Sequence, residues 1–221
     1  GPMFPHALYG TGAVSLAAAD LDGDGDQDIV GARSGSVHIS VLLNHGDGTF
    51  GTEVTYPAAS YPVFVAVADL DGDGDQDLAV ANSISSSVSV FLNQGGGTFA
   101  MHTTIGTGST PRSIAIADLD GDADQDLAVA NYGSNNVSVL LNTGGGTFAP
   151  HVTFATGIQP DSVASDDLDG DGDNDLAVAH YFAAKGGSKV SVLLNQGGGL
   201  FAAPVQYPTG FHQAVSVAIA D

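Results

Sequence analysis

The chain alternates short apolar segments with glycine-rich turns along its whole length. Segments such as 38–42, 87–91 and 136–140 carry Val or Ile at every second position, and this period of two is typical of β-strands with distinct faces. The chain also contains 31 glycines and nine prolines, which punctuate these segments. No apolar run reaches the length of a membrane-spanning helix, so membrane insertion is not expected. The pattern predicts an all-β fold.

The apolar pattern recurs about every 49 residues, and each repeat contains four strand-like segments. A short segment of small residues precedes an acidic loop, two further apolar segments follow, and a glycine-rich turn leads to a more polar fourth segment. Four strands in this length match one blade of a β-propeller, whereas a parallel β-helix has much shorter repeats. We therefore predict a single domain over residues 1–221, a β-propeller with four complete four-stranded antiparallel blades. The expected blades cover residues 13–57, 63–106, 112–156 and 162–208.

The two ends of the chain carry further strand-like segments. Residues 4–10 resemble the fourth strand of a preceding blade, and residues 214–221 resemble the first strand of a following one. Such orphan strands have unpaired edges that attract other strands. We therefore expect either that the chain is a fragment of a larger ring or that copies of it assemble into a homo-oligomer through these strands.

An acidic loop of nine residues occurs once per repeat, first at 20–28 with the sequence DLDGDGDQD. Its aspartates at loop positions 1, 3, 5 and 9 can place carboxylates around one point, and position 7 offers a backbone carbonyl. Ca²⁺ accepts about six to eight hard oxygen ligands of this kind, whereas Mg²⁺ prefers a tighter octahedron. The twelfth position holds Gly or Val instead of the glutamate that an EF-hand requires. The loop thus predicts a calcium site that joins two strands.

Four copies of this loop in register predict one Ca²⁺ ion per complete repeat, four in all. Of the 24 aspartates in the chain, 20 lie in these loops, and without a cation the five carboxylates of each loop would repel one another. A merely solvated acidic surface explains this clustering less well. The predicted metal ligands are Asp20, Asp22, Asp24, Asp26, Asp28, Asp69, Asp71, Asp73, Asp75, Asp77, Asp118, Asp120, Asp122, Asp124, Asp126, Asp167, Asp169, Asp171, Asp173 and Asp175.

Glycine occupies loop position 6 in three of the four repeats, at Gly25, Gly74 and Gly172, where a sharp turn needs a positive φ. The third loop carries Ala123 at this position. Because a Cβ is unfavourable in the left-handed region, we expect the third loop to bind calcium more weakly than the others.

The formal net charge of −21 restricts the partners of the chain. A protein that binds nucleic acid must supply Lys and Arg to the phosphates, and here four such residues stand against 25 acidic ones. We therefore expect no nucleic-acid partner. The chain has no cysteine, which excludes disulfides, zinc–thiolate sites and a cysteine nucleophile.

The four loops, each preceded by the same kind of strand, resemble those of the FG-GAP/VCBS repeat family of bacterial surface and secreted proteins, which is distantly similar to the integrin α-subunit propeller. In that family a DxDxDGxxD loop between the first and second strands of a blade binds Ca²⁺. The resemblance implies this role for the aspartates named above, with position 7 contributing its backbone. It also implies an extracellular or cell-surface setting for a secreted protein.

The loops between the second and third strands of each repeat should lie together on the face opposite the calcium loops. These loops differ most among the repeats, and variable loops on a rigid scaffold often carry a binding site. We therefore expect a protein or glycan ligand on this face, near Arg112, Tyr132, Tyr181, Phe182 and Lys185.

We expect a binding, cell-adhesion or scaffold module and no enzyme. A paired-carboxylate hydrolase is disfavoured, since a catalytic site usually breaks the symmetry that four near-identical loops preserve. The seven histidines, and the phenylalanines that close the glycine-rich turns, are predicted to be structural. Two alternatives stay open: a lectin, or the propeller of a polysaccharide-active enzyme such as a lyase or dehydratase. An asymmetric cluster of His, Tyr, Arg or carboxylate groups at one channel mouth would favour the enzyme.

Overall fold

The computed structural model of the chain describes residues 13–181, 188–210 and 216–219, which form sixteen strands in four antiparallel sheets. Each sheet takes four consecutive strands in chain order. The first sheet contains β1 (Ser15–Ala19), β2 (Asp28–Ala32), β3 (His38–Leu42) and β4 (Val54–Pro57). The second contains β5 (Pro62–Ala68), β6 (Asp77–Asn82), β7 (Ser87–Phe91) and β8 (Thr103–Gly106). The third contains β9 (Pro111–Ala117), β10 (Asp126–Asn131), β11 (Asn136–Leu140) and β12 (Val152–Ala155). The fourth contains β13 (Pro160–Asp166), β14 (Asp175–His180), β15 (Lys189–Leu193) and β16 (Val205–Pro208).

The burial of each strand follows its place in the sheet. The second strands β6, β10 and β14 are buried at all six positions, as expected for near-continuous apolar strands covered on both faces. The outer strands β4, β8, β12 and β16 are largely exposed. The outer strand of each sheet therefore faces solvent, while the middle strands are enclosed between neighbouring sheets.

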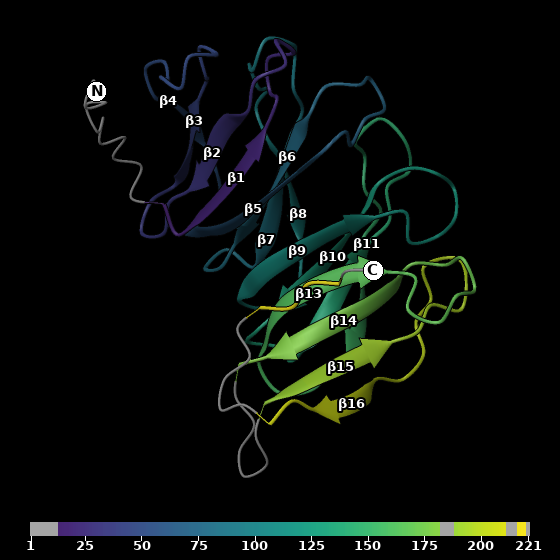
Figure 1. Cartoon of the computed structure of the whole chain (residues 1–221). Coiled ribbons are helices and arrows are strands. Elements are labelled where there is room, and N and C mark those ends of the chain that lie inside the picture. The colour runs from purple at the N-terminus through teal and green to yellow at the C-terminus, as the bar shows by residue number, and fades with distance from the viewer. Residues whose placement is uncertain (1–12, 182–187, 211–215, 220–221) are drawn as a thin grey trace, which may run out of the picture.

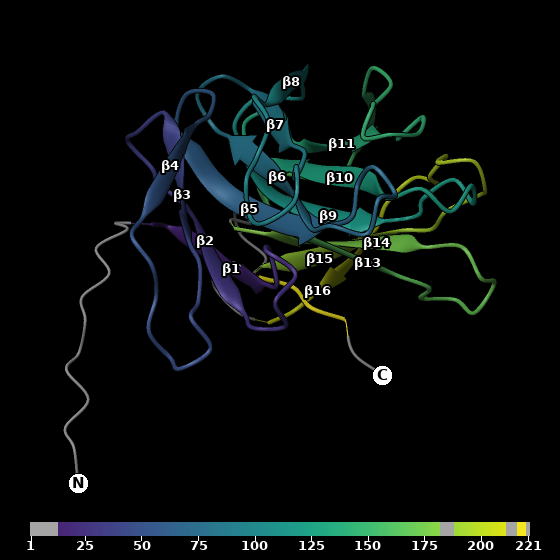
Figure 2. The same ribbon diagram turned by 90° about the horizontal axis from the view of Figure 1, so that it is seen from above.

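Consecutive sheets pack through their first strands, so that β1, β5, β9 and β13 lie next to one another on the inside (Figure 1). Figure 2 shows the same series of sheets from above. Extensive strand contacts link each sheet to the next, and among the described residues no contact of this extent links the fourth sheet back to the first. The structure is a propeller-like series of blades that does not close into a ring.

A separate apolar core fills each of the three spaces between consecutive sheets. Each core combines a leucine from the acidic loop of the earlier sheet with the second-strand side chains of the later one. Phe99 and Phe201, which close glycine-rich turns, are buried in two of these cores, and Phe148 packs against the third. The predicted packing role of these phenylalanines between blades is confirmed.

The predicted all-β fold with four antiparallel blades is also confirmed, but the predicted orphan strands are only partly described. Residues 4–10 lie outside the described residues. Within 214–221, residues 216–219 are described and carry no strand pairing. The Val217 amide nevertheless donates to Ser162 Oγ at 3.3 Å, in the same way that Val65 in β5 donates to Ser15 Oγ at 3.4 Å. This segment thus lies where the first strand of a following blade would begin.

In the part of the chain that the structure describes, no helix is long and apolar enough to cross a membrane.

Candidate metal sites and a ligand pocket

The first aspartate of each acidic loop folds the loop around itself. Asp20 Oδ1 accepts a hydrogen bond from the Gly23 amide at 2.8 Å, and its Oδ2 accepts one from the Gly25 amide at 3.0 Å. The other three loops repeat this pair of bonds. Gly23 and Gly25 have φ values of 80° and 94°, so the turn uses the left-handed region at positions 4 and 6. A positive φ was predicted from the sequence at position 6 alone.

Each loop gathers three carboxylates whose oxygen atoms lie within 4.8 Å of one another. In three loops these belong to positions 1, 3 and 9, as in Asp20, Asp22 and Asp28. The third loop instead gathers Asp118, Asp120 and Asp122, from positions 1, 3 and 5. The remaining predicted ligands, at positions 5 and 7 of the other loops and at positions 7 and 9 of the third, lie outside these groups of three.

The position 9 aspartate is fully buried and bridges two turns. Asp28 Oδ2 accepts the Leu21 amide at 2.8 Å, while its Oδ1 accepts the Asn44 amide at 2.7 Å. Burial raises the pKa of the equivalent Asp77 and Asp126 to about 6, despite the two backbone amides that oppose this shift. A carboxylate that is buried next to others is costly to ionise unless a cation is close.

The carboxyl groups of the position 3 aspartates are also difficult to ionise in all four loops. Burial raises the pKa of Asp22, Asp71, Asp120 and Asp169, and the neighbouring carboxylates raise it further. Converging oxygen donors whose mutual repulsion a cation would relieve suit a hard divalent ion. The loops therefore fit a bound metal ion and are compatible with calcium.

In the second, third and fourth blades, an asparagine at the start of the glycine-rich turn ties the blade to the preceding one. Asn93 Nδ2 donates to Leu21 O in the acidic loop of the first blade at 2.8 Å, and also to Gln76 O in its own blade at 3.0 Å. Asn142 and Asn195 make the equivalent contacts to Leu70 O and Leu119 O. This role was not predicted from the sequence, although an asparagine at the same place before every glycine-rich turn was a usable signal.

Ala123 adopts the conformation that its glycine counterparts adopt. Its φ is 74°, and its amide donates to Asp118 Oδ2 at 3.0 Å. The substitution therefore leaves the fold of the loop intact, and the lower calcium affinity that we expect there stays a prediction.

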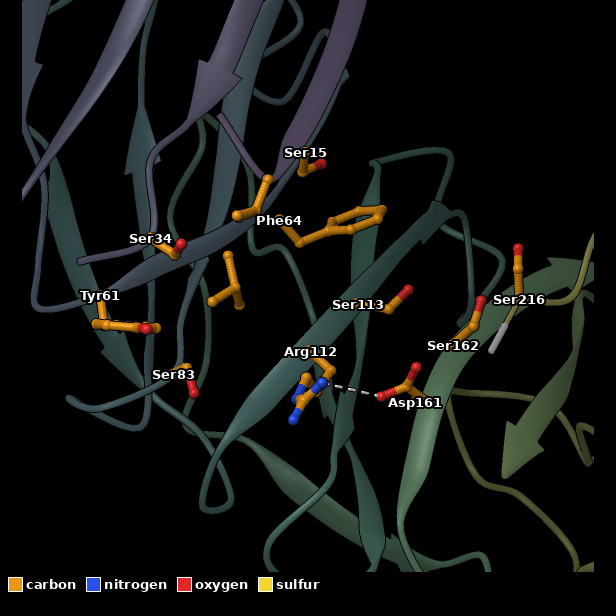
Figure 3. A pocket seen from close by; sticks show the side chains of 12 residues that line it. Ser15, Ser34, Tyr61, Phe64, Ser83, Arg112, Ser113, Asp161, Ser162 and Ser216 are labelled. Carbon is orange, nitrogen blue, oxygen red and sulfur yellow. Dashed lines mark hydrogen bonds and ion pairs between the residues drawn. The ribbon is translucent and has the colours of Figure 1, made fainter. Parts of the chain in front are cut away.

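A cavity of about 550 Å³ opens at the other end of the first strands, on the face opposite the acidic loops (Figure 3). Hydroxyl groups dominate its wall, together with the aromatic rings of Tyr61 and Phe64. The serines that line it are Ser15, Ser34, Ser83, Ser113, Ser162 and Ser216. Two of them, Ser34 and Ser83, follow the second strands β2 and β6, so the variable loops do reach this cavity.

One ion pair makes this cavity asymmetric. Arg112 Nη1 lies 3.3 Å from Asp161 Oδ1 (Figure 3), and the Arg112 guanidinium lies 4.5 Å from the ring centroid of Tyr132, which contacts Tyr181. Burial raises the pKa of Asp161, although Arg112 opposes the shift. The structure thus brings together three of the residues that were predicted on this face, while Phe182 and Lys185 lie outside the described residues.

The described histidines with resolved partners make structural contacts. His180 is buried, with Nδ1 3.0 Å from Ile158 O and Nε2 2.7 Å from Ser191 Oγ. His151 Nδ1 lies 2.7 Å from Gly106 O. Neither histidine lines the cavity.

Comparisons with known proteins agree with this architecture. The sequence profile of the FG-GAP-like repeat matches the chain three times, at residues 20–80, 69–129 and 118–178. Comparison with curated protein sequences found no significant match.

Several solved structures are similar to the chain. A lectin from Agrocybe aegerita, described as recognising non-reducing terminal N-acetylglucosamine, is 28% identical with a TM-score of 0.59, over 86% of this chain and 50% of the lectin. A functionally unknown protein from Desulfotomaculum acetoxidans is 18% identical with a TM-score of 0.63, over 89% of this chain and 56% of that one. The chain therefore spans about half the length of these two solved chains.

Proposed function

Because the chain belongs to the FG-GAP-like repeat family, we propose that it is a β-propeller binding module whose acidic loops hold Ca²⁺ and whose opposite face binds a carbohydrate. The observation that carries this proposal is the separation of the two faces. One face has a cluster of three carboxylates in each of its four loops, whereas the other has an asymmetric cavity.

The calcium ions act as structural links. Sites in extracellular modules have dissociation constants of about 10⁻⁴ to 10⁻³ M, so millimolar calcium stabilises each loop by roughly 1 kcal/mol. This value suits a secreted or cell-surface protein, which meets calcium at that level. The ion also compensates for burying the position 9 aspartate, which holds the acidic loop against the glycine-rich turn.

The chemistry of the cavity suits a sugar. Sugars present hydroxyl groups to polar partners and apolar ring faces to aromatic side chains, and the cavity offers serine hydroxyls, the Arg112–Asp161 pair and the rings of Tyr61 and Phe64. The similarity to a lectin that recognises terminal N-acetylglucosamine supports the same ligand class here. N-Acetylglucosamine is therefore the first probe.

Calorimetric titration of the full chain with N-acetylglucosamine tests this site. Arg112→Gln removes the charged donor of the cavity and should weaken binding about 10-fold or more, since hydrogen bonds to charged groups contribute about 1.5–3 kcal/mol. Arg33→Gln is the matched control, because Arg33 pairs with Glu53 and does not line the cavity. Equal affinity of the two variants would place the sugar elsewhere, and absence of binding to a panel of glycans would refute the carbohydrate proposal.

The asymmetry of the cavity also favours the second candidate, a polysaccharide-active enzyme. A carboxyl group with a raised pKa beside an arginine is a recognised form of acid–base site. We place binding first, because Arg112 is already held between Asp161 and Tyr132. Incubation with polysaccharides and detection of new reducing ends or unsaturated products distinguishes the two, and turnover that Asp161→Asn abolishes would establish the enzyme.

A further inference from the structure

The outer faces at the two ends of the blade series complement each other. Inside the chain, each of the three contacts between consecutive blades buries the leucine at position 2 of the earlier acidic loop, and this leucine is 2% exposed in every case: Leu21, Leu70 and Leu119. The equivalent residue of the fourth blade, Leu168, is 39% exposed. The fourth blade therefore presents an apolar surface that its three counterparts cover with another blade.

The outer strand of the fourth blade is uncovered in the same way. Tyr56 in β4 and Phe154 in β12 pack edge-on against Phe99 and Phe201 of the next blade, with ring centroids 5.4 Å and 5.3 Å apart. The corresponding Tyr207 in β16 is 54% exposed. Leu168 and Tyr207 thus mark the two ends of one uncovered contact surface.

The first blade carries the other half of the same contact. Leu16 in β1 is 60% exposed, whereas the residues at its position in the later blades are 3–5% exposed: Val65, Ile114 and Val163. A Cβ added to Gly48 would meet nothing within 4 Å, but one added to the equivalent Gly97 would lie 2.7 Å from a methyl group of Leu43 in the preceding blade. Asn44 Nδ2 bonds to Gln27 O in its own blade, and no bond to a preceding blade is described for it.

We propose that two copies of this chain associate head to tail, with the first blade of one copy covering Leu168 and Tyr207 of the other. The occupant is a second copy because the chain itself presents both halves of a contact that it already makes three times. The two surfaces differ, so the contact is heterologous, and two such contacts can close a ring.

Docking requires one local rearrangement. In the proposed contact, the Leu16 amide of the incoming copy takes the place at Ser162 Oγ where the Val217 amide now lies. Residues 216–219 make no strand pairing there, so an incoming β1 strand displaces them. The charge of −21 on each copy opposes association, and salt or bound cations are needed to screen it.

The test is the sedimentation equilibrium mass of the full chain in calcium and about 0.15 M salt, an ionic strength at which the Debye length is about 8 Å. The unmodified chain should show a concentration-dependent mass that approaches two copies. Leu168→Asp and Leu16→Asp should each raise the dissociation constant at least about 30-fold, the effect of removing an interface residue that carries about 2 kcal/mol. Leu200→Asp is the control, since Leu200 is 58% exposed in the same blade as Leu168 and its counterparts Thr98 and Thr147 stay exposed between blades.

A mixture of the two variants identifies the geometry. Leu168→Asp keeps an intact first blade and Leu16→Asp keeps an intact fourth blade, so a 1:1 mixture should recover association through one contact. A monomeric mass for the unmodified chain at all concentrations would overturn the proposal. It would equally be overturned if Leu16→Asp associated as well as the unmodified chain, because the fourth blades would then pair with each other. Circular dichroism of both variants confirms that they fold.

Discussion

The two faces of this propeller differ in how closely their side-chain contacts recur from blade to blade. On the acidic face, the bonds within the loop recur in all four blades with nearly equal lengths. On the opposite face, Arg112 and Asp161 occur once each and pair at the wall of one cavity, and Arg112 also contacts Tyr132. Repetition suits a group that must act alike in every blade, such as a structural ion, whereas recognition of one ligand needs side chains that differ from blade to blade.

Removal of calcium should have the largest effect, and it should act on the acidic face. Four sites of roughly 1 kcal/mol each, at about 2–4 °C per kcal/mol for a chain of this size, predict a melting temperature about 8–16 °C lower in EDTA. Differential scanning calorimetry in EDTA, calcium and magnesium measures this change, and magnesium should restore little of it. An unchanged melting temperature would show that the aspartate clusters hold no structural ion.

Loss of the side-chain hydrogen bonds between blades on the acidic face should have the second-largest effect on stability. Asn142→Ala removes hydrogen bonds to Leu70 O, Gln125 O and the Gly144 amide and should lower the free energy of unfolding by about 2–3 kcal/mol. Asn44→Ala is the matched variant, since the described bonds of its side chain stay within the first blade, and it should cost about 1 kcal/mol less. Equal losses in urea denaturation would mean that the contact with Leu70 O adds nothing.

The titration of His180, on the opposite face, should have the smallest effect. Burial lowers the pKa of His180, so the folded chain excludes a proton that the unfolded chain binds below a pH of about 6.5. The contribution of His180 to the free energy of unfolding should therefore fall by roughly 1 kcal/mol between about pH 7 and pH 5.

The matched variant for this measurement is His180→Asn. Asn82 and Asn131 occupy the same position in earlier blades and donate to Ser89 Oγ and Ser138 Oγ, so an asparagine can replace the contact of His180 with Ser191. Urea denaturation in calcium at each pH compares the two chains. Parallel pH profiles would assign the loss to other groups.

The sequence predicted the features that depend on local pattern. Strand alternation, the four-strand repeat and the acidic loops are each set within a few tens of residues, and the structure has them at the expected places. The burial of Phe99 also followed from its fixed position in the repeat.

Features that depend on packing between repeats could not be predicted in the same way. Asn93 bonds to a carbonyl 72 residues away in the chain, and its partner is defined only once two blades stand side by side. Arg112 and Asp161 are 49 residues apart and occupy equivalent places in consecutive blades. The repeat period indicates that such residues are neighbours, but the direction in which each side chain points depends on the cavity around it.

The chain-contiguous order of each sheet has a consequence for how the protein is made. Each blade pairs four strands that follow one another directly, so a blade can form as soon as its own repeat has left the ribosome, with little loop entropy to overcome. Duplication or loss of a whole repeat leaves every strand pairing in the remaining blades intact. The same architecture thus permits both sequential folding during synthesis and growth of the gene by tandem duplication.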